Sequence, residues 1–538
     1  MDRARVAVTG TAGAPAGAVA LCARHAAPDA DAVVAPPRSR SVTTSDANAT
    51  AVRDELKSRT LSSIFWSVLR VAWSSLATFL IFVVLARLLR PEDFGVFALA
   101  SLFFEVGRII ANGGLPDAVM REHTLDEELA DTAFWANLAF SVLIAATVFL
   151  LAPLYERWTQ MPGVGELLRW LCLLMPVAAL GGIHTARIAR EFGHRSMAKQ
   201  TLIVSTVAGV AAVSAAYLGF GVQSLLVQAA LTNVLGALLA WYYLRWTPQW
   251  RFSFARLRQV ISFSAGMMAT QLLWVLMVRV QDLFISRVHG AAAVGQYRVA
   301  WRTIELIGQI VLAPIGSVSL ITLSKLQHQP DAFASAYQRL IGGAALVGLP
   351  LLFGFGAIAE ELIAHVFGRQ WAGTGAIAEV LVFMAVPFVL NYISGPALAA
   401  INRSWTVLAV SALQLACTIL LTWIAVPYGL VAVALAYVFR AYLTAPVQQL
   451  ALCRGVGTSV ASSLSSLSAP LLLSLAMAMA VWIAKPYLAA ELGHGVPLIL
   501  VCTLLGTALY VLGIATFARA ITCRYLEPLK ALVLHRNR

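Results

Sequence analysis

Long apolar segments recur along almost the whole chain after residue 60 and are separated by short polar loops. Most are about 18 to 25 residues long, as a helix must be to cross a hydrocarbon core about 30 Å thick. They are too long and too uniformly apolar for the alternating strands of a membrane barrel, so the pattern predicts helices. About fourteen spans are expected, at residues 62–86, 94–114, 132–152, 167–186, 200–219, 222–244, 260–286, 294–315, 340–360, 375–397, 404–425, 429–448, 464–484 and 496–518.

The composition agrees with this pattern. Of the 538 residues, 59% are hydrophobic and 12% are charged, and the mean hydropathy is +0.78. Because so few charges cannot cover a soluble protein of this size, we predict an all-α polytopic membrane protein. The net charge of +13 is spread over short loops, which argues against a nucleic-acid partner. The six cysteines are scattered without a CxxC pair, so neither a disulfide framework nor a metal site is expected.

The basic residues predict the orientation in the membrane. With a cytoplasmic N-terminus, the inside segments carry 21 Lys and Arg residues and the outside loops carry six, leaving aside Arg169, Arg298 and Arg302, which the span boundaries do not assign to a side. The positive-inside rule therefore places both termini in the cytoplasm. Residues 1–58 begin the chain without a signal-peptide core or a periodic pattern, and we expect either a disordered cytoplasmic tail or a start codon set too early.

Two parts of the chain resemble each other. Residues 87–105 and 287–305 share Arg, Gly, Ala and Glu at four equivalent positions, and Phe97 corresponds to Tyr297. Two dipeptides recur at a separation of 208 residues: Arg195-Ser196 as Arg403-Ser404, and Phe220-Gly221 as Tyr428-Gly429. We interpret these matches as two copies of one unit.

The repeat predicts the domain organisation. Each copy holds six spans, so the second starts on the same side of the membrane as the first and the copies are parallel. We expect a tail at 1–58, an N-lobe at 59–245, a C-lobe at 246–455, two further spans within 456–520 and a cytoplasmic tail at 521–538. Two such lobes enclose a site near the bilayer middle and rock about it.

One loop between the lobes combines aromatic and basic residues. Trp246, Trp250, Phe252 and Phe254 alternate with arginines. This pattern predicts an anchor at the level of the lipid headgroups.

Several spans contain ionisable residues, each of which costs about 2.5–3.5 kcal/mol on insertion scales. Three pairs lie three residues apart, which favours ion pairing within one helix. They are Glu105 with Arg108, Arg279 with Asp282, and Arg302 with Glu305. Arg70 lies in the first span, and Arg440 in the twelfth has no acidic residue within one turn. For Arg440 we expect a water-filled cavity, an anionic ligand or a carboxylate from another helix.

These arginines predict an anion site. Planar guanidinium groups bind phosphate oxygens in pairs, so a phosphate or pyrophosphate group is the expected ligand. The predicted substrate-binding residues are Arg70, Arg108, Arg279, Arg302 and Arg440. Glu105, Asp282 and Glu305 are expected either to couple an ion or to pair with the arginines. Gln271, Trp274, Gln281 and Asn391 are expected to support the site.

Enzyme signatures are missing from the sequence. It contains no HExxH, no GxxxxGK[ST] phosphate loop and no GxSxG, and its nine histidines show no metal-ligand spacing. We therefore expect no enzyme activity, no cofactor and no metal, with energy drawn from a gradient, the membrane potential or a partner.

The segment between the first two spans, RLLRPEDFGVFALA at residues 87–100, resembles the hallmark of bacterial polysaccharide-transporter flippases of the Wzx type. Their superfamily, the multidrug/oligosaccharidyl-lipid/polysaccharide exporters, also includes drug/cation antiporters and the lipid II flippase. The resemblance covers roughly residues 58 to 520. It implies that an undecaprenyl-pyrophosphate-linked oligosaccharide crosses from the cytoplasmic to the periplasmic leaflet of the inner membrane, for exopolysaccharide, capsule or O-antigen assembly. Membrane lipids and the polymerase and export proteins of that pathway are the implied partners.

The resemblance also bears on the arginines. In the related lipid II flippases the essential arginines lie in the first, second and eighth spans, where Arg70, Arg108 and Arg302 fall here. A multidrug/cation antiporter is the main alternative, because three acidic residues lie in the spans. A membrane-embedded polysaccharide polymerase or ligase is disfavoured, because no outside loop is long enough to carry its catalytic residues.

Overall fold

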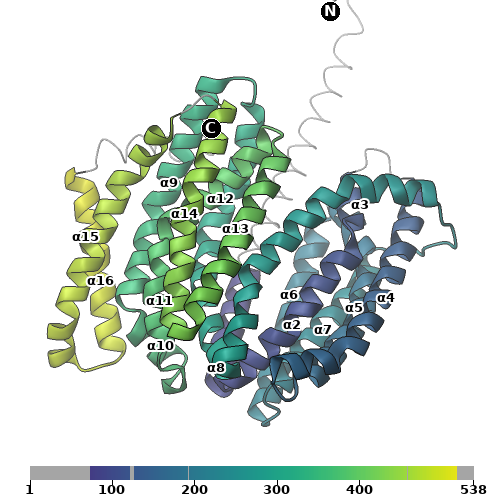
Figure 1. Ribbon diagram of the computed structural model, residues 1–538, viewed down its shortest axis with the longest axis horizontal. Helices are drawn as coiled ribbons and strands as arrows, with labels where there is room; N and C mark the ends of the chain where they lie inside the picture. Colours follow the sequence, from purple (N-terminus) through teal and green to yellow (C-terminus); the bar gives the residue numbers. More distant parts are fainter. Residues whose placement is uncertain (1–72, 122–125, 192, 457–458, 518–538) are drawn as a thin grey trace, which may run out of the picture. The chain divides into compact units, whose positions relative to one another are not determined.

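The computed structural model describes residues 73–121, 126–191, 193–456 and 459–517 (Figure 1). Within these ranges all regular secondary structure is helical, as predicted. The labelled elements are α2 Pro91–Asn112, α3 Leu115–Arg121, α4 Glu127–Thr159, α5 Val164–Arg190, α6 His194–Tyr217, α7 Gln223–Tyr243, α8 Phe254–Lys325, α9 Pro330–Ala357, α10 Ala359–Val366, η1 Arg369–Trp371, α11 Thr374–Leu381, η2 Val382–Met384, α12 Ala385–Ala400, α13 Ser404–Ala425, η3 Val426–Tyr428, α14 Leu430–Val456, α15 Val460–Leu492 and α16 Val496–Phe517. The predicted tails at 1–58 and 521–538 lie outside the described residues.

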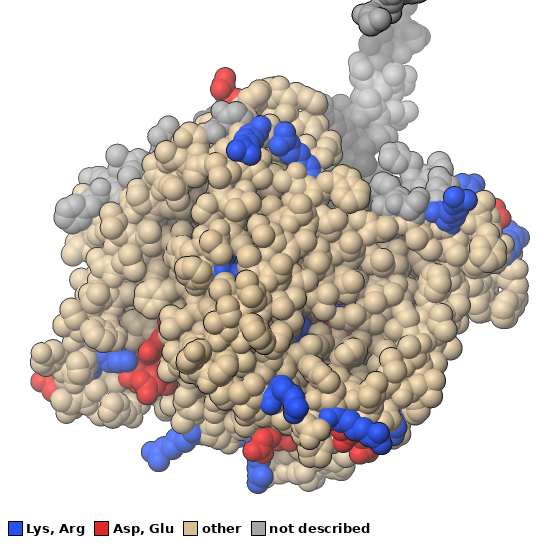
Figure 2. Space-filling view, in the orientation of Figure 1, with Lys and Arg blue, Asp and Glu red and all other residues tan. Residues whose placement is uncertain are grey.

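Twelve of the described helical segments are long and apolar enough to cross a membrane. One of them, Met268–Lys325, has 58 residues, far more than the roughly 20 that one crossing needs. A shorter apolar helix, Trp73–Leu88, lies where the end of the first span was expected. On the face seen in Figure 2, charged side chains lie mostly toward two opposite ends, with a largely uncharged band between them. The chain is thus a multi-pass membrane protein, and the number of fourteen spans stays a prediction.

Helix α2 begins and ends where its sequence favours a boundary. Pro91 occupies the first turn, where its missing N–H removes no hydrogen bond. The Asp93 carboxylate accepts a hydrogen bond from the Arg90 backbone N–H at 2.9 Å, which caps the start of the helix. Gly113 follows the last turn with φ +51°, a left-handed conformation that glycine adopts without steric cost.

The two similar segments share a helix–break–helix geometry. The helix Trp73–Leu88 stops before Arg90, whose backbone is extended (φ −84°, ψ 157°), and α2 then begins at Pro91. Two hundred residues later, α8 is interrupted at Gly290, whose φ of +84° and ψ of 179° belong to a region open to glycine alone. The break divides α8 into a half before Gly290 and a half after it.

The glycines of the two segments bring their backbones into contact. A Cβ added to Gly95 would clash with the carbonyl oxygen of Ala291, and one added to Gly295 would clash with that of Pro91. In each contact, the glycine of one segment meets the first residue of the helix in the other segment. The two segments therefore contact each other in the same way. Helix α2 and the second half of α8 therefore pack backbone against backbone, which only residues without a side chain permit.

A second attachment lies at the turn before α2. The indole Nε1 of Trp371 and the amide Nε2 of Gln370 both donate to the carbonyl oxygen of Ala86, each at 2.7 Å. Arg87 donates in the opposite direction, from Nε to the Val366 carbonyl at 2.6 Å. These bonds satisfy a carbonyl at the end of the first helix and tie it to the α10–η1 region.

The predicted headgroup anchor divides into two parts. Trp246 turns inward: its indole donates to Glu127 Oε2 at 3.0 Å and lies 4.5 Å from the Arg187 guanidinium. Trp250 and Phe254 are 87% and 78% exposed. Trp246 is thus partly buried, with charged partners from helices far away in sequence. The headgroup anchor stays a prediction for all four aromatic residues.

The glycine crossing is testable by adding one methyl group. We expect Gly95→Ala and Gly295→Ala each to lower the free energy of unfolding by about 1–3 kcal/mol, because the new Cβ meets a backbone carbonyl that cannot rotate away. Thermal unfolding of the purified protein would measure this. Gly343→Ala is the matched control, because a Cβ there meets nothing within 4 Å. Unchanged unfolding temperatures in both crossing variants would contradict the contact.

Candidate functional site

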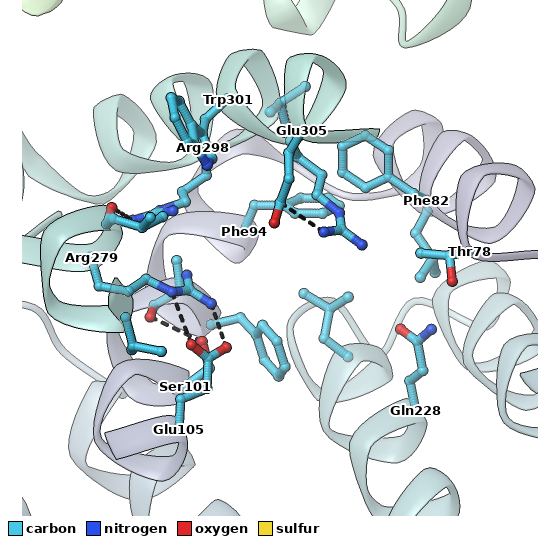
Figure 3. Close-up of a pocket in the computed structure, with 18 of the residues that line it drawn as sticks. Thr78, Phe82, Phe94, Ser101, Glu105, Gln228, Arg279, Arg298, Trp301 and Glu305 are labelled. Atoms are coloured by element: carbon cyan, nitrogen blue, oxygen red, sulfur yellow. Dashed lines mark hydrogen bonds and ion pairs between the residues drawn. The ribbon is translucent and has the colours of Figure 1, made fainter. Parts of the chain in front are cut away.

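A cavity of about 560 Å³ lies beside the crossing, and its size is typical of ligand-binding sites. Its walls come from the helix Trp73–Leu88, α2, α7 and both halves of α8, as Figure 3 shows in part. The charged lining residues are Glu105, Arg108, Arg279, Arg298, Arg302 and Glu305, and the polar or aromatic ones include Ser101, Gln228, Trp274 and Trp301.

Carboxylates pair with the arginines of this cavity, and Figure 3 shows the contact between Arg279 and Glu105. Arg279 binds Glu105 with two hydrogen bonds, from Nη2 at 2.5 Å and from Nε at 3.2 Å. Asp282 is fully buried and accepts from Arg298 Nε at 2.7 and 2.6 Å, whereas Arg279 Nη1 stands 3.8 Å from it. Arg298 also donates to the Val278 carbonyl at 2.6 Å. Two guanidinium groups are thereby neutralised, and α2 is tied to α8.

The pairing within single helices was confirmed for two of the three pairs. Arg302 Nη1 lies 2.7 Å from the Glu305 carboxylate, and Arg279 Nη1 lies 3.8 Å from that of Asp282. The prediction was wrong for Glu105 with Arg108. Glu105 contacts Arg279, 174 residues away, instead of Arg108 one turn along the same helix. A guanidinium facing both oxygens of a carboxylate makes a better contact than a side chain on the same helix surface can offer.

Arg108 therefore forms no ion pair with Glu105. It lines the cavity, its side chain is exposed there, and among the described residues no carboxylate pairs with it. Arg302, with its side chain 33% exposed, presents the rest of its guanidinium beside Glu305. The cavity therefore offers two cationic groups that have donors to spare.

Arg440 lies in a separate, smaller chamber of about 190 Å³. Its side chain is almost fully buried at 3% exposure, with the guanidinium 4.2 Å from the centre of the Tyr437 ring. Among the described residues, its guanidinium forms one hydrogen-bonding contact, a weak one from Nη1 to the Met277 sulfur at 3.5 Å. Arg440 thus lines this chamber and not the larger cavity, and its role in substrate binding stays a prediction. The chamber shares Trp274, Val278, Trp301 and Glu305 with the cavity and is also lined by Met384, Phe388, Asn391, Tyr392 and Ala441.

The remaining predicted residues lie in different parts of the structure. Arg70 lies outside the described residues. Gln281 is buried and bonded to the Tyr297 hydroxyl at 2.8 Å, so it supports packing instead of the cavity. Gln271 lines another small pocket beside Asp117. Trp274 lines both the cavity and the chamber, and Asn391 lines the chamber alone.

Sequence reasoning missed several cavity residues, among them Arg298, Trp301 and Gln228. Arg298 was set aside because the predicted span boundary ran close to it. Its position four residues before Arg302 in a helix places the two on one face, and this spacing could have identified it. Nothing local distinguishes Gln228 from other polar residues in spans.

Comparison with known proteins relates this chain to transporters. The chain is 26% identical over 480 residues to the succinoglycan biosynthesis transport protein ExoT of Rhizobium meliloti (strain 1021), covering 87% of this chain and 95% of ExoT. It is 22% identical over 345 residues to the lipopolysaccharide biosynthesis protein WzxC of Escherichia coli (strain K12), covering 60% and 67%. Its fold resembles the inward closed conformation of the lipid II flippase MurJ, with a TM-score of 0.65 and 13% identity over 86% of this chain and 99% of MurJ. The polysaccharide biosynthesis protein family matches residues 84–376, more than half of the sequence, and this chain belongs to that family.

Proposed function

We propose that this protein flips an undecaprenyl-pyrophosphate-linked oligosaccharide from the cytoplasmic to the periplasmic leaflet of the bacterial inner membrane. Both termini would face the cytoplasm, and the polymerase and export proteins of an exopolysaccharide, capsule or O-antigen pathway would take over the product. The observation that carries the proposal is the membrane-embedded cavity in which Arg108 and Arg302 have donors to spare. The transport and flippase names of the relatives support it.

The chemistry of the cavity suits a pyrophosphate. Phosphate oxygens only accept hydrogen bonds, and guanidinium groups only donate them, in a planar arrangement that matches two oxygens. A charged sugar head cannot enter hydrocarbon without a large desolvation penalty, so a polar cavity within the membrane lowers the barrier to its crossing. Gln228, Ser101 and the indole faces of Trp274 and Trp301 would contact the sugars, while the polyprenyl tail stays in the lipid.

The acidic residues favour this function over cation antiport. Glu105, Asp282 and Glu305 each contact a guanidinium group within the described residues. A carboxylate that already neutralises an arginine attracts a cation weakly. In our proposal these carboxylates orient the arginines and hold α2 against α8 until the substrate binds.

Removing the available arginines tests the anion cavity. We expect Arg302→Gln and Arg108→Gln each to reduce polymer export at least tenfold, with completed lipid-linked units accumulating in the cytoplasmic leaflet. Mass spectrometry of these units, combined with their accessibility to a periplasmic glycosidase, would measure both effects. Arg157→Gln, an exposed arginine outside the cavity, is the control. Normal export by both cavity variants would refute the proposal.

Exchanging the partners of one ion pair tests the role of the carboxylates. Glu105→Arg and Arg279→Glu should each place like charges together and lower both stability and transport. The double variant restores an opposite pair, so we expect it to recover at least half of the lost unfolding temperature and measurable flipping. If Glu105 instead binds a coupling cation, the double variant will regain stability without any transport, and that result would favour the antiporter.

A further inference from the structure

A groove away from the central cavity combines apolar walls with one carboxylate. It has a volume of about 300 Å³ and lies between the end of α9, the α11–η2 segment and α15, so we call it the α15 groove. Among the described residues, Glu379 is the one charged side chain that lines it. The other lining residues are aliphatic, aromatic or glycine, and they include Phe383, Leu475, Met479 and Trp482. A carboxylate between such walls is unfavourable unless a partner or water compensates its charge.

The protein does not neutralise Glu379. This carboxylate forms no hydrogen bond or ion pair with any residue that the structure describes, and the charged groups that act on it are Lys485, Glu360 and Glu361. The Lys485 ammonium donates to Glu361 instead, at 3.1 Å, and both of these side chains are 15% exposed. Three carboxylates therefore share one ammonium group, so this end of the α15 groove attracts a further cation.

The α15 groove lies near a membrane surface and faces lipid. Helix α15 has 33 residues, more than the roughly 20 that cross a hydrocarbon core, so its last third reaches the level of the headgroups. Trp482 and Lys485 lie in this third, and tryptophan and lysine are typical of that level. Phe383, Met479 and Trp482 are each more than half exposed. Helices α15 and α16 form the edge of the helical array at the left of Figure 1, so the groove opens toward the surrounding bilayer.

These features together favour one class of ligand. A bare metal ion needs several oxygen ligands, whereas this groove offers one carboxylate and apolar walls. An ammonium group carried on an apolar body matches both. The indole N–H of Trp482 donates to no described residue and lies at the mouth of the groove, where it suits a phosphate or ester oxygen.

We propose that the α15 groove binds an aminophospholipid of the surrounding bilayer. The lipid ammonium pairs with Glu379, its phosphate or ester oxygen accepts from Trp482, and one acyl chain lies along Phe383, Leu475 and Met479. The bound lipid fills the space between α15 and the α11–η2 segment and so joins α15 to the rest of the helices. This site is separate from the central cavity, and the proposal does not rest on the proposed function.

Native mass spectrometry of the full-length protein tests the proposal. The probes are phosphatidylethanolamine and phosphatidylglycerol with identical acyl chains, supplied in equal amounts, because only the first carries an ammonium group. We expect the protein to retain phosphatidylethanolamine roughly tenfold better, and Glu379→Gln to reduce this preference to less than about twofold. Glu491→Gln is the matched control and should keep the preference, because this exposed carboxylate lies at the end of α15 outside the groove.

A second variant separates the two contacts of the lipid head. Trp482→Phe keeps an aromatic wall and removes the indole N–H, so it should weaken retention of both lipids about threefold while the preference for the ammonium head remains.

The unsubstituted protein is measured first, so the test does not depend on how any variant folds. Equal retention of the two lipids by this protein would overturn the proposal, as would a preference that survives Glu379→Gln. A dimer that forms in place of lipid binding and is lost in Trp482→Phe would assign the groove to a second copy of the chain and would also overturn it.

Discussion

The crossing of α2 with the second half of α8 is the contact on which the rest of the site depends. Gly95 and Gly295 each place their backbone against a carbonyl of the other segment. Glu105 and Glu305 follow these glycines by ten residues, or about 15 Å along each helix. Both carboxylates line the cavity. The two helices cross at equivalent positions, so residues equally far along each helix lie equally far from the crossing point.

The charges around the cavity follow from this geometry and from the membrane. Each ionisable group in a span needs a partner or water, and Glu105, Arg279, Asp282 and Arg298 satisfy one another across the crossing. Because the arginines outnumber the carboxylates, some guanidinium groups remain available for a ligand. In the proposed function these groups would hold the phosphorylated head of the substrate.

The two cavities differ in how their arginines are paired. The larger one holds a partly satisfied set of arginines. The smaller one holds Arg440, which is nearly buried and has no carboxylate partner in the part of the chain that the structure describes. Trp301 and Glu305 belong to both walls.

The sequence by itself determined the all-helical membrane fold, the approximate positions of the spans, the repeat and the identity of most arginines in the cavity. These features depend on the apolar length of a segment, on the cost of placing a charge in it and on identities at a fixed separation, all of which are local or can be counted along the chain. Only the tertiary structure decided that Glu105 pairs with Arg279, that Arg298 belongs to the cavity and that Arg440 lies in its own chamber. The periodicity of a helix shows which face of the helix a side chain occupies. The partner of a long charged side chain depends on how closely two helices cross and at what level. Here two glycines that are two hundred residues apart in the sequence set the distance between the crossing helices.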